Sequence, residues 1–238
     1  MGTVVSFALV APDSADANAA IEAAVEWLHL VDRTLSPYRE DSEVSRMARE
    51  ELSPEESGPL LAEILSLGEH AVSDGQGAFT LHPGGRFDPS GLVKGWALER
   101  ASAILLECGM TDHLVNGGGD VQAEGEREPG LPWRVAVADP RDRTRTIAVL
   151  GARSGGLAVA TSGTSERGEH IEGASDGLLS LTVVGRSLTE VDVAATTAFA
   201  LGDKGRAWID ERPSLAGMAV MDGGRMWTSQ RFADYIVA

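Results

Sequence analysis

The chain has few cysteines, few aromatic residues and few positive charges, and each shortage excludes a class of protein. Its 238 residues include one cysteine, Cys108, which excludes an intramolecular disulfide and a zinc site made of four cysteines. Cys108 falls on the apolar side of a predicted helix, so we expect a buried thiol with a structural role. Only two residues are tyrosines. One of them, Tyr38, falls on a predicted loop, either as a surface side chain at a corner between helices or as part of a site.

Positive charge is scarce. The 20 basic residues are outnumbered by 36 acidic residues, which gives a net charge of −16. A nucleic-acid partner is therefore not expected, because phosphate backbones are bound by basic surfaces. If the ligand carries phosphates, the site itself must supply local cations, glycine amides or a divalent metal.

Long apolar runs are also missing. The chain begins MGTVVSFAL, without a basic segment and a following apolar stretch, so the sequence predicts neither a signal peptide nor a membrane span. We therefore expect a cytoplasmic protein, or one whose leader has been removed. We find no internal repeat and no low-complexity tract.

Hydrophobic periodicity predicts both helices and strands. Helical periodicity predicts four long helices. Two of them cover 15–35 and 189–201. The third follows Ser53-Pro54 and ends before Ser73, and the fourth follows the 88–91 turn and ends near Cys108. Shorter helices are expected up to Met47 and over 204–210. Strand patterns cover 3–10, 113–115, 121–125, 133–139, 144–150, 157–161, 179–185, 216–221 and 225–228, and the polar segment 124–132 is expected to be a loop. Short polar connections favour antiparallel pairing. We expect an α+β fold, with helices packed on a mostly antiparallel sheet, in a single domain spanning residues 1–238.

The stretch from Phe87 to Gly125 has the layout of an anion site. A turn, Asp88-Pro89-Ser90-Gly91, leads into a helix that carries Lys94 near its start. A short strand then leads to the glycine turn Asn116–Asp120. Two turns that expose backbone groups thus bracket one helix, and each carries a carboxylate, which suits an anion held with the help of a metal.

A second pair of residues suits a hard cation. Asp192 and Thr196 are four residues apart on a predicted helix, so their side chains share one face. A carboxylate and a hydroxyl one turn apart suit magnesium. Alternatively, Asp192 occupies the first helical turn, where negative charge is favourable, and Thr196 bonds back to a carbonyl.

Several common motifs are excluded. The glycines at 117–119 precede a strand, whereas a dinucleotide-binding fingerprint opens a helix. The sequence contains no GxxxxGK[ST] phosphate loop and no GxSxG nucleophile elbow. Glu169-His170 lacks the second histidine of a metalloprotease pair.

Seven short segments, in order along the chain, together resemble the FAD:protein FMN transferases, the ApbE family. They are MGT at 1–3, SPY…SEVS at 36–45, DPSGLVKG at 88–95, VNGGGD at 115–120, ATSG at 160–163, EHI at 169–171 and DVAAT at 192–196. The resemblance implies a T-fold-like version of the α+β fold. It also implies an enzyme that cleaves FAD at its pyrophosphate, joins the FMN phosphate to a Thr or Ser hydroxyl of an acceptor protein, and releases AMP. Such phosphoryl transfer depends on positioning and charge neutralisation, for which an acidic chain needs magnesium.

The resemblance also assigns roles to individual residues. Asp192 and Thr196 would bind magnesium, joined by a backbone carbonyl of the 88–91 turn, that of Gly91. Asp88 would hold the nucleotide part of FAD, and Lys94 would reach its phosphates. His170 would be the general base for the acceptor hydroxyl, since an unperturbed imidazole titrates near pH ~6.5. The remaining contacts with the flavin or adenine would come from Met1, Tyr38 (stacking on a ring), Ala78, Phe79, Thr80 and Ile171, with the 116–120 turn shaping the pocket wall.

Two departures from the family pattern suggest alternatives. The family usually has Ile-Asp-Pro and a Thr-Gly turn after its histidine, whereas this chain reads IEGASDG after His170, and Thr80 stands where an aspartate is common. The altered loop bears on how an acceptor docks. A protein that binds FAD without transfer is therefore one alternative, and a hydrolase that gives FMN and AMP is another.

Overall fold

The computed structural model describes residues 2–11, 14–152, 155–163 and 177–237. Its centre is a seven-stranded sheet in the order β1–β2–β3–β8–β9–β10–β11, and every neighbouring pair is antiparallel. The strands are β1 (Val5–Leu9), β2 (His113–Gly117), β3 (Asp120–Glu124), β8 (Leu157–Gly163), β9 (Leu178–Gly185), β10 (Ala216–Met221) and β11 (Met226–Thr228). The expected α+β fold with an antiparallel sheet is confirmed.

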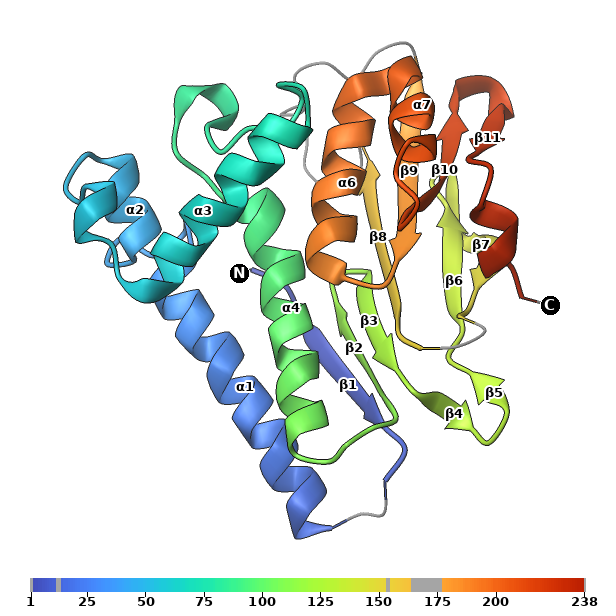
Figure 1. Ribbon diagram of the computed structural model, residues 1–238, viewed down its shortest axis with the longest axis horizontal. Helices are drawn as coiled ribbons and strands as arrows, with labels where there is room; N and C mark the ends of the chain where they lie inside the picture. Colours follow the sequence, from blue (N-terminus) through green and yellow to red (C-terminus); the bar gives the residue numbers. More distant parts are fainter. Residues whose placement is uncertain (1, 12–13, 153–154, 164–176, 238) are drawn as a thin grey trace.

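Helices cover one face of this sheet (Figure 1). They are α1 (Ala15–Leu35), α2 (Glu43–Ala48), α3 (Pro59–Asp74), α4 (Ser90–Glu107), α6 (Leu188–Leu201) and α7 (Gly205–Asp210), with short 3-10 helices at Pro54–Glu56, Pro83–Gly85, Gly202–Lys204, Asp222–Gly224 and Phe232–Tyr235. Serine side chains cap α1 and α2, since Ser14 Oγ accepts the Ala17 N–H at 3.2 Å and Ser42 Oγ accepts the Ser45 N–H at 3.0 Å. Figure 1 shows α1 and α4 side by side, with α6 over β8 and β9.

A separate hairpin covers part of the opposite face. It consists of β6 (Val135–Asp139) and β7 (Asp142–Leu150), which pair with each other and form a two-stranded sheet of their own. Val135, Val137 and Leu150 of the hairpin pack with Phe232 and the outward side chains of the central sheet. The main core lies on the helical side, so the sheet is enclosed between two apolar clusters.

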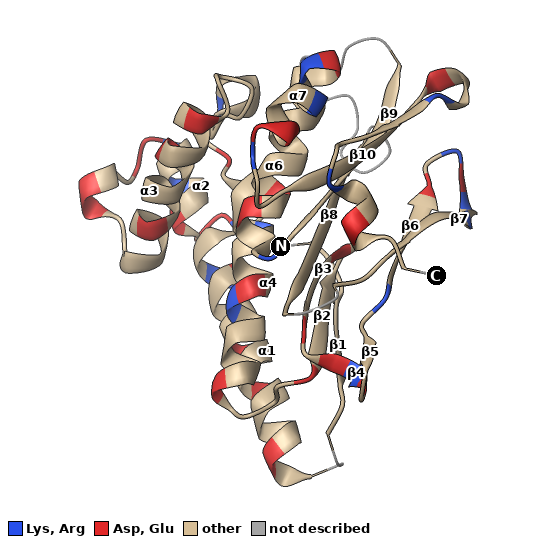
Figure 2. Ribbon diagram, turned by 45° about the vertical axis from the view of Figure 1, so that its right-hand side comes forward, with Lys and Arg blue, Asp and Glu red and all other residues tan. Residues whose placement is uncertain are grey.

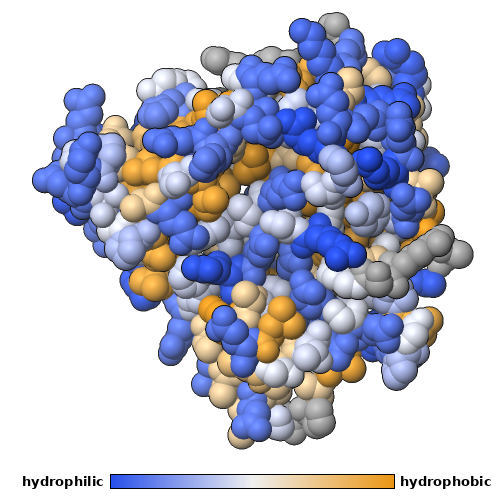
Figure 3. All heavy atoms as spheres, viewed as in Figure 1, coloured by the Kyte–Doolittle hydropathy of each residue, from blue (hydrophilic) through white to orange (hydrophobic). Residues whose placement is uncertain are grey.

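Charged and hydrophobic residues are distributed unevenly over the surface. Figure 2 shows basic residues at the turn end of the β6–β7 hairpin, while acidic residues are scattered over the helices. Hydrophobic residues reach the surface over α3 and the start of α4 (Figure 3). Among the described residues, no helix is both long and apolar enough to cross a membrane.

Three local expectations are wrong. Cys108 is exposed, because it follows the last turn of α4 and lies beyond the helix's apolar face. The segment expected to be a loop at 124–132 contains a small hairpin, β4 (Glu126–Glu128) with β5 (Leu131–Pro132). The helix after Ser53-Pro54 begins only at Pro59, because Pro54–Glu56 forms a separate 3-10 turn capped by Ser53 and Glu56.

The crossing of α4 and α6 requires a glycine. A Cβ added at Gly95 would meet the Leu188 carbonyl oxygen at 2.6 Å and the Asp192 Cβ at 2.7 Å. The Gly95 N–H donates a hydrogen bond to Asp192 Oδ2 at 2.9 Å. Close approach of the two backbones therefore brings the buried Asp192 against the first turns of α4.

Candidate functional site

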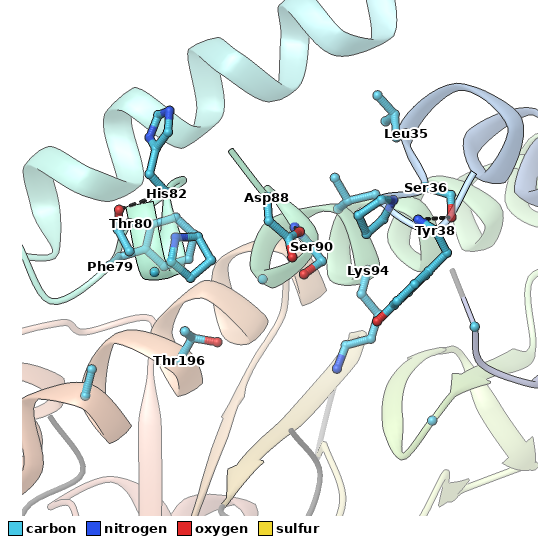
Figure 4. Close-up of a pocket in the computed structure, with 18 of the residues that line it drawn as sticks. Leu35, Ser36, Tyr38, Phe79, Thr80, His82, Asp88, Ser90, Lys94 and Thr196 are labelled. Atoms are coloured by element: carbon cyan, nitrogen blue, oxygen red, sulfur yellow. Dashed lines mark hydrogen bonds between the residues drawn. The ribbon is translucent and has the colours of Figure 1, made fainter. Parts of the chain in front are cut away.

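A cavity of about 1060 Å³ opens at the start of α4 (Figure 4). This volume is slightly larger than the usual ~300–1000 Å³ of ligand pockets. Seven parts of the chain contribute to the lining of the cavity: Gly2 and Thr3, residues 35–38, residues 77–85, the start of α4, the β2–β3 turn, Arg143 of β7, and α6. A ligand in it would contact segments that are far apart in the sequence.

Tyr38 stands at the mouth of the cavity with 81% of its surface exposed. Its backbone is fixed by local bonds, since Ser36 Oγ accepts the Tyr38 N–H at 3.3 Å and Ser42 Oγ donates to the Ser36 carbonyl at 2.7 Å. Ser45 Oγ also donates to the Pro37 carbonyl at 3.3 Å. A rigid loop thus holds an exposed aromatic ring where a flat ligand could stack on it.

The loop between α3 and α4 forms a second wall. Phe79 anchors it, with 2% of its surface exposed, while Ala78 and Thr80 line the cavity. Thr80 Oγ1 accepts the His82 N–H at 3.0 Å, so this hydroxyl stabilises the loop itself. The His82 ring packs against Phe87 with centroids 5.5 Å apart and points away from Asp88 and Lys94 in Figure 4.

The start of α4 contributes polar groups. Asp88 Oδ1 accepts the Ser90 N–H at 2.9 Å, which caps the first turn of the helix. Asp88, Ser90, Gly91 and Lys94 all line the cavity. The positive end of the α4 dipole and one ammonium group therefore face the same space.

Lys94 connects this wall to two buried carboxylates. Its Nζ forms a short ion pair with Asp120 Oδ2 and lies 3.9 Å from Asp192 Oδ1. The side chains of Asp120 and Asp192 are 2% and 3% exposed, and that of Lys94 is 22% exposed. This cluster contains two negative charges and one positive charge, in a place where water screens them little.

Asp192 and Thr196 take different positions relative to the cavity. Thr196 lines it, and its Oγ1 lies 3.5 Å from Ser162 Oγ on β8. Asp192 is one turn earlier on α6 and lies behind the lining, against Gly95. Hydroxyl oxygens of α6 and β8 thus lie together at the cavity, with a carboxylate one turn away on α6, and such oxygens are the ligand type that a hard cation prefers.

Two residues near the cavity had no individual role predicted from the sequence. Asp120 was assigned to a wall-shaping turn, whereas it is the ion-pair partner of Lys94. Arg143 carried no signal, because its place in the lining depends on how the hairpin lies across the sheet. The hairpin end is braced nearby, since Asp139 accepts bonds of 2.8 Å from Arg141 Nε and Nη2. Those bonds lower the pKa of Asp139 to about 2.

Three residues expected at the site, Met1, His170 and Ile171, lie outside the described residues. Within the described ranges, no group of three or more His, Cys, Asp or Glu side chains is arranged to hold a metal. A cation here would therefore depend on hydroxyl and carbonyl oxygens beside Asp192, as magnesium permits.

Comparisons with known proteins agree on one family. The model of the ApbE family matches residues 1–84 and 80–219. The FAD:protein FMN transferase of Salmonella typhimurium is 26% identical over 168 residues, covering 63% of this chain and 48% of the relative. The enzyme of the same name from Rhodobacter capsulatus is 40% identical over 88 residues, covering 36% of this chain and 16% of the relative. The chain spans about half the length of the Salmonella relative.

Solved structures agree on the fold. The flavin transferase ApbE from Vibrio cholerae superposes with a TM-score of 0.82 at 20% identity, covering 99% of this chain and 96% of that one. The ApbE protein from Thermotoga maritima superposes with a TM-score of 0.85 at 21% identity, covering 100% and 97%. The arrangement of sheet and helices is therefore shared at low sequence identity.

Proposed function

Because the chain belongs to the ApbE family, we propose that it transfers FMN from FAD to a Thr or Ser hydroxyl of an acceptor protein, with magnesium, and releases AMP. The observation that carries the proposal is the gathering of Tyr38, Asp88, Lys94 and Thr196 around one cavity. The relatives named FAD:protein FMN transferase support it. The cavity volume suits a ligand of dinucleotide size.

Three walls of the cavity provide the contacts with FAD. The exposed ring of Tyr38 stacks on a flat ring of the ligand, beside the loop of Ala78, Phe79 and Thr80. Asp88 contacts the nucleotide part, and the Lys94 ammonium contacts the phosphates at the N-terminus of α4. Met1 and Ile171 complete the contacts.

Magnesium fits the oxygen atoms at the α4–α6 crossing. The Gly95 N–H donates to Asp192 Oδ2, so this carboxylate lies beside the first turns of α4, one turn from Gly91. Gly91 and Thr196 both line the cavity. We therefore assign Asp192, Thr196 and the Gly91 carbonyl as ligands. Bound magnesium would neutralise charge on the pyrophosphate.

His170 acts as the general base in this proposal. It takes the proton from the acceptor hydroxyl as that oxygen attacks the phosphorus of the FMN portion, and AMP leaves from the other side. Lys94 and the α4 N-terminus hold the phosphates in line with the attacking oxygen. Replacing His170 with alanine should abolish transfer and leave FAD binding largely intact. Loss of binding would instead make His170 a structural residue.

Transfer is tested directly with FAD, magnesium and a candidate acceptor. We expect the acceptor to carry flavin fluorescence on a denaturing gel, with one AMP released per acceptor labelled. FAD binding with neither fluorescence nor AMP would overturn transfer in favour of a binding protein. AMP release without a labelled acceptor would indicate a hydrolase.

The metal site is tested by Asp192→Asn, which preserves the shape of the side chain. We expect the magnesium affinity of the FAD-bound protein, measured by calorimetry, to fall at least about tenfold, since even indirect ligand contacts are worth that much. Glu190→Gln on the same helix is the control, because Glu190 is exposed and accepts a bond from Ser214. An unchanged titration for Asp192→Asn would remove Asp192 from the metal site.

A further inference from the structure

The carboxylate of Asp120 is buried at the edge of the cavity, and the mechanism above does not use it. Asp120 opens β3 directly after the glycine turn and is 1% exposed. Its Oδ1 accepts the Thr161 N–H of the neighbouring strand β8 at 3.3 Å, and its Oδ2 pairs with Lys94 Nζ. The carboxylate therefore links the rigid sheet to the mobile end of a lysine.

An ion pair of this kind restricts the rotamers of a lysine side chain and so fixes the position of its ammonium. Its four-carbon stem carries about 2 kcal/mol of rotamer entropy, which a ligand must otherwise overcome when it orders the ammonium. Lys94 lines the cavity with 22% of its side chain exposed, so its ammonium lies at the wall and not in bulk water. Fixing it there before the ligand arrives lowers the cost of binding.

The Lys94 ammonium also lies within ion-pair distance of the proposed metal ligand, Asp192. Lys94 Nζ is closer to Asp120 than to Asp192, whose Oδ1 lies 3.9 Å away. Asp192 is held from its other side by the Gly95 N–H. Asp120 thus holds the ammonium towards β3, while Asp192 has the Gly95 N–H as a second partner besides Lys94.

We propose that Asp120 is a positioning residue that holds the Lys94 ammonium at the cavity wall for the phosphates of a dinucleotide. The ligand class rests on the proposed function. Asp120 acts only through Lys94 and makes no contact with the ligand itself. Its effect on binding should therefore vanish when Lys94 is absent.

A double-mutant cycle tests this dependence. FAD affinity is measured by flavin fluorescence for the wild-type chain, Asp120→Asn, Lys94→Met and the double variant. We expect Lys94→Met to weaken binding about tenfold or more, the size of a lost bond to a charged group, and Asp120→Asn to weaken it several-fold. The double variant should match Lys94→Met within about twofold. Equal losses from Asp120→Asn in both backgrounds would overturn the proposal and make Asp120 a structural residue.

Asp139→Asn is the matched control. Asp139 is also a buried aspartate paired with a basic side chain, Arg141, but it does not line the cavity. Its effect on FAD affinity should be smaller than that of Asp120→Asn and should not depend on Lys94. If Asp139→Asn weakens FAD as much as Asp120→Asn does, the effect is a general loss of stability and the proposal fails.

Inorganic pyrophosphate is the second probe, and it separates this proposal from the proposed function. If pyrophosphate binds and follows the same cycle while FAD does not bind, the transferase function fails and the role of Asp120 stands. If FAD binds but Lys94→Met does not weaken it, the role of Asp120 fails and the transferase function stands. If neither probe binds the wild-type chain, both proposals fail.

Discussion

The N–H of Gly95 on α4 donates to Asp192 Oδ2 on α6 at 2.9 Å, and no side chain separates the two helices there. Gly95→Ala would place a methyl group 2.6 Å from the Leu188 carbonyl oxygen. Because that neighbour is backbone, the helices must move apart, and we expect a loss of about 1–3 kcal/mol in the free energy of unfolding. Urea unfolding measures it. Glu107→Ala, at the exposed end of α4, should change little.

In an exposed helix the same glycine-to-alanine change would stabilise the protein by up to about 1 kcal/mol. A gain in stability for Gly95→Ala would therefore contradict the close helix crossing. The variant should also lower magnesium affinity, since Asp192 is held by the displaced helix turn.

Tyr38→Ala should weaken FAD binding without changing the melting temperature. The ring is 81% exposed, so its removal costs the folded state little. Stacking of an aromatic side chain on a base is worth about 1–3 kcal/mol, which corresponds to roughly fivefold or more in affinity. Flavin fluorescence quenching measures the dissociation constant. Tyr38→Phe keeps the ring and should bind like the wild-type chain, and an equal loss for both variants would point to the hydroxyl group.

Arg143→Ala should weaken FAD binding in a salt-dependent manner. Arg143 is an exposed cation in the cavity lining, so its attraction for phosphate is screened by ions. We expect a several-fold loss of affinity at about 0.05 M salt that nearly disappears at about 0.5 M. Arg145→Ala removes the same charge two residues away, outside the lining, and should have a smaller effect. Equal effects would show that only the overall charge of the hairpin matters.

His113 should make the chain less stable in mild acid. Burial lowers the pKa of His113, whose ring nitrogens bond to Ser102 Oγ and the Met110 carbonyl at 2.7 Å. Because the folded pKa lies below the unfolded value of about 6.5, the unfolded chain binds more protons in that window, and stability falls as the pH drops below about 6.5. Urea unfolding at about pH 7.5 and about pH 5.5 measures the fall.

His113→Gln should be less stable at both pH values but lose less between them. Asp139, with a pKa of about 2, stays ionised over this range and does not contribute. His29→Gln, at an exposed position of α1, is the control and should keep the wild-type pH dependence. If His113→Gln keeps the full pH dependence of stability, that dependence comes from other titratable groups.

Local signals were sufficient to predict most elements of the fold. Ser14 and Ser42 are side-chain caps, Gly109 ends α4 with a φ of 81°, and the glycines at 223 and 224 turn the last hairpin. Helix caps and turn glycines act over a few residues, so the sequence alone indicates them. The exposed position of Cys108 was mispredicted because this residue is the C-cap of α4 and lies beyond the buried face of the helix.

Contacts between distant segments could not be predicted in the same way. The pairing of Lys94 with Asp120 depends on how α4 packs on β3, and the place of Arg143 depends on a hairpin that forms a two-stranded sheet of its own. Neither follows from periodicity or capping. The family resemblance pointed to Tyr38, Asp88, Lys94 and Thr196, which do share a cavity, because it carries information on tertiary structure that no local pattern holds.

The first strand of the chain pairs with a strand more than a hundred residues later, as in the pairing of Val5 with Gly117. The cavity likewise joins Gly2 and Thr3 to Thr196 and Ala200. Contacts between segments so far apart in the sequence form late in folding. The cavity is therefore assembled only after these long-range contacts have formed. A partly folded chain thus lacks the cavity altogether, and a ligand that binds there captures only molecules that have finished folding.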